Sequence, residues 1–489
     1  MQLRKLLDEA DIFLKTPIDD IEITGICSDA RLVQQGNIFV ALRGLRHDGV
    51  SFASEAFSRG AALVIAERPV GGVPHLVVEN ARAALACLFD AWYGHPARGL
   101  TLIGITGTNG KTSTAFMLAE ILRLAGHRTA VIGTVSTDGQ GEPLVLAAED
   151  PLANMTTPDP AVLYRHLAHL RDEGVTHVVM EVTSHALLFS KVAPLRFARA
   201  LFTNLTPDHL DLHGDMTSYY AVKRSLFAQA EQGIVSLFCA YGQSLADSLE
   251  IPFLTLGREH LRGVTLSGDR GAAFTLVTPK GELAITLPVP GEFSVENAAL
   301  AALTALSLGV SAATVCRALS GFLGVPGRME RVGDSPLRIS VFIDYAHTPD
   351  ALERLLLSVR RFKGAAQRVI LVFGCGGDRD RSKRPKMGEI ATRLADFTVL
   401  TSDNPRSEPP ETILSEIAVG MNPEKPHKII PDRREAIAYA IGVAREGDIV
   451  LLAGKGHERY EIRGDARLAF DERAIARAAL FEKATRYGR

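Results

Sequence analysis

Gly107-Thr108-Asn109-Gly110-Lys111-Thr112 is the stretch that decides the fold, because it follows an apolar segment (101–106) and precedes a helical pattern (113–125). A glycine-rich turn between a strand and a helix is typical of a phosphate-binding loop. The backbone N–H groups of such a loop bind phosphate oxygens, its lysine neutralises them, and a threonine hydroxyl reaches Mg²⁺. The stretch therefore predicts an α/β protein that uses a nucleoside triphosphate.

The loop departs from the general pattern at one position. Ile105 stands where that pattern has its first glycine, and Gly107 supplies the tight turn instead. We interpret the stretch as a compact variant of the loop. The alternative, a glycine-rich turn with a solvated lysine, is disfavoured by the strand–loop–helix context.

Length and composition bound the class of protein. A chain of 489 residues, at roughly 100–200 residues per domain, predicts about three domains. Apolar residues make up 46% and charged residues 22%, as in ordinary globular proteins. The formal net charge of -2 gives no electrostatic argument for nucleic acid or for an anionic membrane. Small-molecule substrates are expected.

The cysteines and the apolar runs indicate a cellular location. The five cysteines are scattered and form no Cys-x-x-Cys pair, so we expect reduced, mostly buried thiols and neither disulfides nor zinc. The first residues lack the uninterrupted apolar core of a signal peptide. No apolar run reaches the roughly 18–20 residues that span a membrane. We expect a cytoplasmic protein without membrane insertion.

Three α/β domains are predicted from the pattern of strands and helices. Residues 1–97 alternate short strands with helices, residues 98–325 contain the phosphate loop and a parallel sheet, and residues 326–489 alternate strands and helices as in a doubly wound, Rossmann-like sheet. Pro and Gly mark the junctions at 95–99 and 326–328.

Polar side chains follow several of the predicted strands. Glu181 ends one strand of the central domain and His209 follows the next, so both are candidate metal ligands near the phosphate loop. Taken singly, each is equally explained as a solvated residue at a strand end. Arg379 and Arg406 follow neighbouring strands of the last domain, and paired guanidinium groups suit a substrate with carboxylates. An exposed loop of mixed charge is the alternative there.

Eight motifs resemble, in order and spacing, those of the Mur ligases of peptidoglycan synthesis. They are GTNGKT (107–112), MEVTSHAL (180–187), FTNLTPDHLDLHG (202–214), PGRMERV (326–332), DYAHTPDALE (344–353), FGCGGDRDRSKRP (373–385), DNPRSE (403–408) and AGKGHE (453–458). The resemblance runs from about residue 25 to beyond residue 460.

The resemblance implies a three-domain enzyme that uses ATP and Mg²⁺. ATP would phosphorylate the D-glutamate carboxylate of UDP-N-acetylmuramoyl-L-alanyl-D-glutamate, and the amine of meso-diaminopimelate would displace the phosphate to form an amide. The first domain would bind the UDP substrate, the central one ATP and the last one the amino acid. A monomer is expected.

The resemblance also implies roles for individual residues. The nucleotide positions are Gly107, Thr108, Asn109, Gly110, Lys111, Thr112, Ser113, Asn297, Arg328 and Asp344. The catalytic positions are Lys111, Glu181, His209 and Lys223. The metal positions are Thr112, Glu181, His209 and Lys223, the last as a carbamate, because an ammonium would repel Mg²⁺. From the residues alone, Lys223 is an ordinary surface lysine.

Two further sets are implied for the substrates. The UDP-substrate positions are Ser28, Ala30, Thr156, Thr157, Ser184 and Lys191. The diaminopimelate positions are Arg379, Asp403, Asn404, Pro405, Arg406, Gly454 and Glu458. Three positions depart from the residues common in the family: Ala30 replaces Ser, Phe189 replaces Gln and Lys191 replaces Arg. We therefore expect this part of the UDP-substrate pocket to differ from that of other family members.

Arg406 discriminates between members of the family. Diaminopimelate carries a second carboxylate that lysine lacks, and a buried guanidinium facing lysine would lose its partner at a cost of roughly 1–3 kcal/mol. The alternatives are the lysine-adding ligase, a folylpolyglutamate synthase, and a P-loop ATPase that acts as a switch. The last would turn over ATP without an amine.

Overall fold

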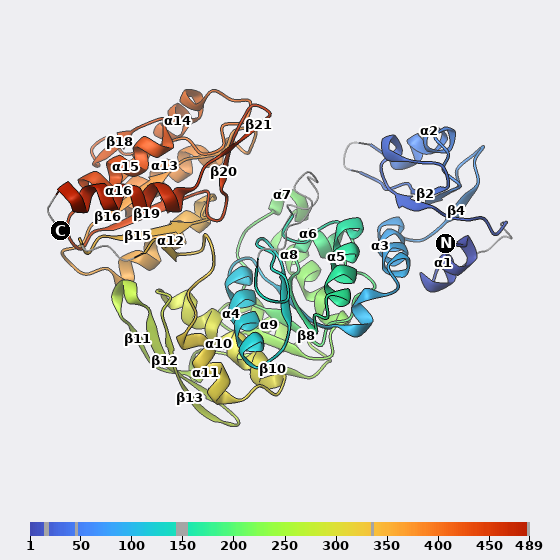
Figure 1. Cartoon of the computed structure of the whole chain (residues 1–489), viewed down its shortest axis with the longest axis horizontal. Coiled ribbons are helices and arrows are strands. Elements are labelled where there is room, and N and C mark those ends of the chain that lie inside the picture. The colour runs from blue at the N-terminus through green and yellow to red at the C-terminus, as the bar shows by residue number, and fades with distance from the viewer. Residues whose placement is uncertain (14–18, 45–46, 143–154, 334–336, 487–489) are drawn as a thin grey trace. The chain divides into compact units, whose positions relative to one another are not determined.

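The computed structural model describes residues 1–13, 19–44, 47–142, 155–333 and 337–486. Contacts divide the chain into two compact units, one of Met1–Arg258 with Leu303–Val310 and one of Glu259–Ala302 with Ser311–Arg489. Each unit holds more than one sheet (Figure 1). The division into three domains at residues 97 and 325 stays a prediction.

The first part of the chain forms a small parallel sheet in the order β1-β2-β3-β4. Its elements are α1 (Leu3–Glu9), β1 (Gly25–Cys27), β2 (Asn37–Val40), α2 (Ala53–Ser58), β3 (Leu63–Ala66), β4 (His75–Val77) and α3 (Ala81–Trp92). The predicted linker at 95–99 is a 3₁₀ helix, Pro96–Gly99, that contacts α5 (Pro160–Asp172).

A second sheet of six parallel strands has the order β10-β9-β8-β5-β7-β6. Its strands are β5 (Thr101–Thr106), β6 (Thr129–Ile132), β7 (His177–Glu181), β8 (Arg199–Phe202), β9 (Gly233–Ser236) and β10 (Phe253–Leu256). Its other helices are α4 (Lys111–Leu124), α6 (Ser184–Leu188), α7 (Leu210–His213), α8 (Met216–Arg224) and α9 (Ala240–Ala246). Most residues of β5 to β9 are buried, as expected where helices cover both faces of a parallel sheet.

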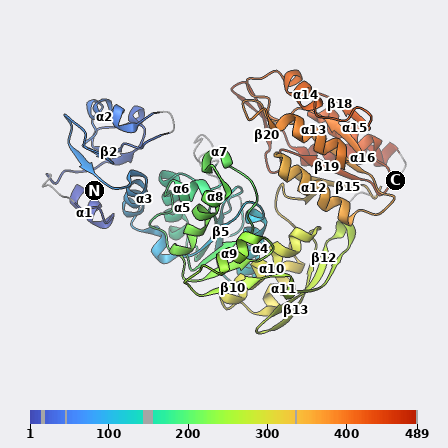
Figure 2. The ribbon, with the colours of Figure 1, turned by 180° about the vertical axis from the view of Figure 1, so that it is seen from behind.

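An antiparallel sheet, β11-β12-β13, follows (Figure 2). Its strands are β11 (Leu261–Leu266), β12 (Ala272–Thr278) and β13 (Gly281–Leu287), and the next helices are α10 (Glu292–Ser307) and α11 (Ala312–Ser320). Burial alternates along β13, because one face of the sheet packs against α11 and the other meets solvent.

The last sheet has the order β14-β15-β19-β16-β17-β18 and is parallel except for β14. Its strands are β14 (Glu330–Arg331), β15 (Ser340–Asp344), β16 (Val369–Phe373), β17 (Phe397–Leu400), β18 (His427–Ile429) and β19 (Ile449–Ala453). One face packs against α12 (Pro349–Phe362), α13 (Lys383–Leu394) and α14 (Pro410–Ala418), and the other against α15 (Arg433–Val443) and α16 (Glu472–Arg486) (Figures 1 and 2). A hairpin, β20 (Tyr460–Arg463) and β21 (Ala466–Ala469), follows β19. The predicted doubly wound sheet is confirmed.

Local sequence explains where several helices begin. Thr348 caps α12 by accepting the N–H of Ala351, and Pro349 occupies the first turn, where no N–H is needed. Asp215 caps α8 in the same way.

Among the described residues, no helix combines the length and apolarity that crossing a membrane requires. The five cysteines are free; Cys375 is buried and the other four are half-buried, which corrects the expectation of mostly buried thiols.

Candidate active site

The phosphate loop lies at the end of β5, between β7 and β8. Gly107 has φ 145°, and a Cβ on it would lie 1.9 Å from Thr203 Oγ1. No other residue fits this turn, because the side chain would overlap Thr203. Gly110 (φ 83°) occupies the N-cap of α4.

Residues after β8 hold the loop in place. The Thr108 N–H donates to the Asn204 carbonyl oxygen (2.9 Å), and the Asn109 N–H donates to Asn204 Oδ1 (3.0 Å). Thr203 Oγ1 donates to the Asn109 carbonyl oxygen at 2.6 Å. The site residues predicted from the sequence omit Thr203 and Asn204, although the FTNLTPDHL motif that contains them was recognised.

Lys111 curls over the loop. Its Nζ donates to the carbonyl oxygens of Gly107 (2.9 Å) and Thr108 (2.8 Å). Ser113 is half-buried on the first turn of α4. The lysine charge therefore sits at the place where the loop and the helix N-terminus together favour an anion.

Thr112 and Glu181 form a buried oxygen-rich pair. Thr112 Oγ1 donates to Glu181 Oε2 at 3.1 Å, and the Thr134 N–H donates to Glu181 Oε1 at 2.9 Å. A Cβ on Gly133 would lie 2.2 Å from Glu181 Oε1, so the backbone approaches the carboxylate more closely than any side chain allows. Gly133 is a site residue that the sequence reasoning missed, because no motif marks it.

Lys223 is buried, which corrects its interpretation as an ordinary surface lysine. It is 1% exposed, and its Nζ donates to the Gly107 carbonyl oxygen at 2.8 Å. Burial, and secondly the nearby charge of Lys111, hold the pKa of the Lys223 amine well below its usual value. This shift favours the neutral form of the amine, which is the form that reacts with carbon dioxide.

His209 is exposed at the start of α7, with φ 52°. Its ring packs against His185 with the centroids 4.9 Å apart, and its Nε2 lies 3.5 Å from Asp208. Within the residues that the structure describes, no three His, Cys, Asp or Glu side chains are arranged to hold a metal ion. The oxygens of Thr112 and Glu181 suit Mg²⁺, whereas Lys223 would suit it only with an added anionic group.

Four of the predicted UDP-substrate residues gather around the end of β7. Thr157 Oγ1 donates to the Glu181 carbonyl oxygen (2.9 Å), and Thr156 Oγ1 lies 3.1 Å from Thr134 Oγ1. Ser184 Oγ lies 3.0 Å from His213 Nε2. Lys191 is 8% exposed and pairs with Asp159 at 2.5 Å. The Lys191 charge is thereby balanced inside the protein.

The other residues of this set lie on the small first sheet. Ser28 is exposed directly after β1, and Ala30 is buried at the start of a short 3₁₀ helix. Phe189, the second departure from the family pattern, packs under the Arg82 guanidinium, which lies 4.5 Å from the ring centroid. Phe189 therefore contributes a cation–π contact at this position.

In the second unit, Asp344 accepts N–H groups from Met329 (2.8 Å) and Ala346 (2.9 Å) at the end of β15. Burial raises the pKa of the Asp344 carboxyl, and the charge of Arg328 opposes this shift. The Arg328 guanidinium lies 5.0 Å from the centroid of the Tyr345 ring. Asn297 is 7% exposed on α10.

A buried polar cluster follows β17 and β19. Lys455 is fully buried; its Nζ donates to Asn404 Oδ1 (2.9 Å) and lies 3.7 Å from Asp403 Oδ1. Asn404 Nδ2 donates to Glu458 Oε2 at 2.8 Å. Burial, and secondly the charge of Asp403, raise the pKa of Glu458. A Cβ on Gly454 (φ 117°) would lie 2.5 Å from Asp403 Oδ2. Lys455 was not among the predicted residues, although it lies in the AGKGHE motif.

Arg406 lies on the loop after β17 and faces the turn after β16. Its Nη1 donates to the carbonyl oxygens of Gly377 (2.9 Å) and Asn404 (3.4 Å). A Cβ on Gly377 would lie 1.9 Å from the Pro405 carbonyl oxygen, so the two loops are in close contact. Arg379 is exposed on the same turn as Gly377.

Models of three Mur ligase domains match the chain. They are the "Mur ligase family, catalytic domain" over residues 22–93, the "Mur ligase middle domain" over 105–305 and the "Mur ligase, glutamate ligase domain" over 327–456.

Relatives and a solved structure match the chain over nearly its full length. A protein of Geobacillus kaustophilus (strain HTA426) named UDP-N-acetylmuramoyl-L-alanyl-D-glutamate–2,6-diaminopimelate ligase is 44% identical, covering 94% of this chain and 96% of the relative. A protein of Gloeobacter violaceus with the same name is 42% identical over 99% of both chains. A solved structure of a ligase of that name superposes with a TM-score of 0.70 at 30% identity, covering 99% of both chains. The chain belongs to the Mur ligase family.

Proposed function

We propose that this chain is the ATP-dependent ligase that adds meso-diaminopimelate to UDP-N-acetylmuramoyl-L-alanyl-D-glutamate. The full-length similarity to relatives of that name supports the reaction. The observation that carries the choice of amine is Arg406, whose guanidinium lies on the loop after β17, at the carboxyl ends of parallel strands, and donates to the carbonyl oxygens of Gly377 and Asn404.

The reaction joins two groups that do not combine unaided. A carboxylate is a poor electrophile, so the γ-phosphoryl group of ATP is first transferred to the D-glutamate carboxylate, giving an acyl phosphate and ADP. The amine of diaminopimelate then attacks the acyl carbon and expels inorganic phosphate, and the ammonium loses a proton as the amide forms. Lys111 and the N–H groups of the loop would offset the repulsion between the anions.

Thr112 and Glu181 are the residues that would hold Mg²⁺, since their oxygens already lie together in a buried position. Mg²⁺ would stabilise negative charge on the transferring phosphoryl group. Lys223 would contribute after carbamylation, for which its lowered pKa prepares it. His209 would lie near the proposed Mg²⁺ site. ATP is the proposed co-substrate.

The cluster after β17 and β19 suits the zwitterionic end of an amino acid. Asp403 and Glu458 offer carboxylates to an ammonium, and Arg406 and Arg379 offer guanidinium groups to a carboxylate. Lysine would leave the guanidinium without an anion, which disfavours the lysine-adding alternative.

The remaining assignments are proposed on the same basis. Residues 1–97 with Ser28 and Ala30 would bind the UDP moiety, and Thr156, Thr157, Ser184 and Lys191 the rest of that substrate. Asn297, Arg328 and Asp344 would contact the nucleotide. We place the enzyme in the cytoplasm as a monomer, where its substrates are small, charged molecules.

Phosphate release tests the proposal. The protein is incubated with ATP, Mg²⁺ and the UDP-muramoyl dipeptide, with meso-diaminopimelate, L-lysine or no amine. Turnover that requires diaminopimelate is expected. Turnover with lysine at the same rate would contradict the choice of amine, and equal turnover without any amine would contradict ligase activity.

A further inference from the structure

Two loops face each other at the proposed amino-acid site. One is the turn 374–380 after β16, and the other is the loop 403–408 after β17. The Gly377 N–H donates to the Asn404 carbonyl oxygen at 2.9 Å, and the Gly377 carbonyl oxygen accepts from Arg406 Nη1 at 2.9 Å. The orientation of Arg406 therefore depends on where the turn 374–380 lies.

Both loops contain a residue in the left-handed conformation. Arg406 has φ 52° and Asp378 has φ 54°, a conformation that costs energy for any residue with a Cβ. Hydrogen bonds hold the two residues there. The Arg406 N–H donates to Ile462 in β20 (3.0 Å), and the Asp378 carboxylate accepts from the Ser407 N–H (3.1 Å) and hydroxyl (2.7 Å).

Arg384 and Glu408 connect the two loops through hydrogen bonds. Arg384, on α13, is 0% exposed and donates to Glu408 Oε1 (2.9 Å) and Oε2 (3.0 Å). The same guanidinium donates to the Gly376 carbonyl oxygen at 3.2 Å. Glu408 Oε1 also accepts the Asp378 N–H at 2.6 Å. One buried guanidinium thus contacts both loops, and its carboxylate partner ties them together.

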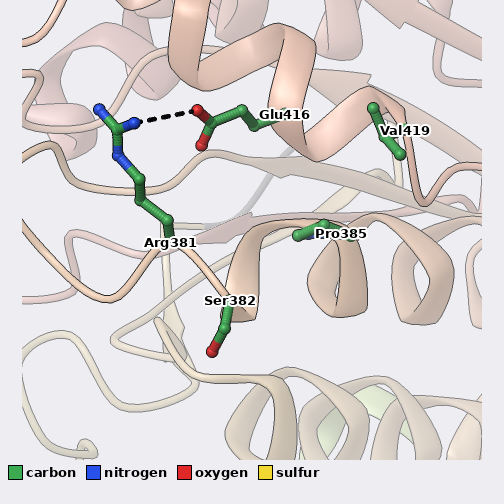
Figure 3. A pocket seen from close by; sticks show the side chains of 5 residues that line it. All are labelled: Arg381, Ser382, Pro385, Glu416 and Val419. Atoms are coloured by element: carbon green, nitrogen blue, oxygen red, sulfur yellow. Dashed lines mark ion pairs between the residues drawn. The ribbon is translucent and has the colours of Figure 1, made fainter.

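A second carboxylate accepts from the same nitrogen of Arg384 that donates to Glu408 Oε2. Glu416, on α14, accepts from Arg384 Nη1 at 2.7 Å. Arg381 Nη1 lies 3.5 Å from Glu416 Oε1, and both residues line a hollow of about 320 Å³ (Figure 3). Arg381 also donates to Glu408 Oε2 at 2.7 Å. The Arg384 guanidinium is therefore held between two carboxylates, and a shorter or non-planar cation could not make the same set of bonds.

We infer that Arg384 and Glu408 are positioning residues that set the selectivity for an amino acid with a second carboxylate, because they hold the turn 374–380 and the loop of Arg406 in register. This inference rests on the proposed function. Neither residue needs to touch a substrate. Their role is to keep the Arg406 fork in the one orientation that accepts a carboxylate from diaminopimelate.

The variants Arg384→Met, Arg384→Lys and Glu408→Gln test this role. KM is measured for ATP, for the UDP-muramoyl dipeptide and for diaminopimelate, together with the ratio of kcat/KM between diaminopimelate and lysine. In each variant we expect KM for diaminopimelate to rise about tenfold or more and the ratio to fall by a similar factor, with the other two KM values within about twofold. Arg384→Lys keeps the charge but not the fork, so it should behave like Arg384→Met.

Arg368→Met is the matched control. Arg368 donates to Asp448 Oδ2 at 3.0 Å, and the two residues directly precede β16 and β19, at the amino ends of these strands and away from the loops that follow their carboxyl ends. Its loss should lower Tm without changing KM for diaminopimelate or the selectivity ratio.

Unchanged selectivity in folded Glu408→Gln would overturn the inference, and this variant carries the test if Arg384→Met fails to fold. A parallel rise of all three KM values, matching the loss of Tm, would also overturn it, since that is the signature of a structural role. If the wild type itself shows no diaminopimelate-dependent turnover, the proposed function fails and the inference fails with it. If the wild type shows diaminopimelate-dependent turnover and Glu408→Gln keeps the wild-type selectivity, the inference is overturned and the proposed function stands.

Discussion

The Thr112 hydroxyl donates a hydrogen bond to Glu181 Oε2 at 3.1 Å, and both side chains are almost fully buried. The bond joins the first turn of α4 to the end of β7, across 69 positions of the sequence. Glu181 accepts the Thr134 N–H with its other oxygen, so the carboxylate is fixed in place.

Glu181→Gln should abolish most of the turnover while preserving the fold. The amide keeps the size of the side chain but loses the negative charge proposed to hold Mg²⁺, and removing one such electrostatic group costs about 10²–10³ in kcat. Phosphate release at saturating ATP measures the loss, and circular dichroism checks the fold. A loss below about threefold would contradict the role.

Gly133→Ala should also reduce turnover, because the added Cβ would lie 2.2 Å from Glu181 Oε1 and must displace the carboxylate. Gly442→Ala is the matched control: no atom lies within 4 Å of its Cβ position on helix α15. We expect the control to keep full activity and to gain roughly 0.5–1 kcal/mol of stability from helix propensity. Equal activity of the two variants would show that Gly133 does not constrain Glu181.

Lys223→Met should stabilise the unmodified protein at neutral pH while removing activity. The pKa of Lys223 is lowered by folding, so holding the proton on Lys223 costs more free energy in the folded state than in the unfolded state, and this disfavours folding below the ordinary lysine pKa. The penalty shrinks as the pH approaches the ordinary lysine pKa of about 10.4. Chemical denaturation of the wild type and the variant at pH 7 and pH 10 measures the difference. A stability advantage of Lys223→Met over the wild type that grows from pH 7 to pH 10 would contradict a lowered pKa of Lys223.

Carbamylation of the same residue has a direct spectroscopic test. Wild-type protein equilibrated with ¹³C-bicarbonate should show a carbamate carbon resonance in NMR, and Lys223→Met should lack it. Persistence of the resonance in the variant would assign the modification to another amine.

Arg406→Lys should weaken binding of diaminopimelate and narrow the preference over lysine. A lysine ammonium cannot match a carboxylate with two parallel hydrogen bonds, and an imperfect partner for a desolvated charge costs roughly 1–3 kcal/mol, about 10- to 100-fold in KM. KM for both amines measures the effect. Full retention of the preference would place the discrimination elsewhere.

The stability that Glu408 contributes should depend on pH. The hydrogen bond from Arg384 first, and the Asp378 N–H second, lower the pKa of the Glu408 carboxyl to about 2 from its ordinary value of 4.5. A carboxyl with a lowered pKa stabilises the fold above pH 4.5, and this contribution is lost as the pH falls toward 2. The Tm difference between wild type and Glu408→Gln should therefore shrink over that range. Glu424→Gln, at an exposed position, should show no such trend.

The sequence alone determined the elements whose signals are local. The phosphate loop was predicted from Gly107, Gly110 and Lys111 because strand, glycine turn and helix follow each other directly. The doubly wound last sheet was predicted for the same reason, since its strands and helices alternate along the chain. These features depend on neighbouring residues, and neighbours are visible in a sequence.

Tertiary structure decided which distant residues share a site. β5 lies between β7 and β8, and this order places Glu181 and Thr203 beside the loop. It also buries Lys223 against Gly107, 116 positions away, which no local pattern distinguishes from a surface lysine. The close approaches at Gly133 and Gly377 were invisible for the same physical reason. Strand order and backbone proximity arise from the packing of the whole sheet, so only the folded chain defines them.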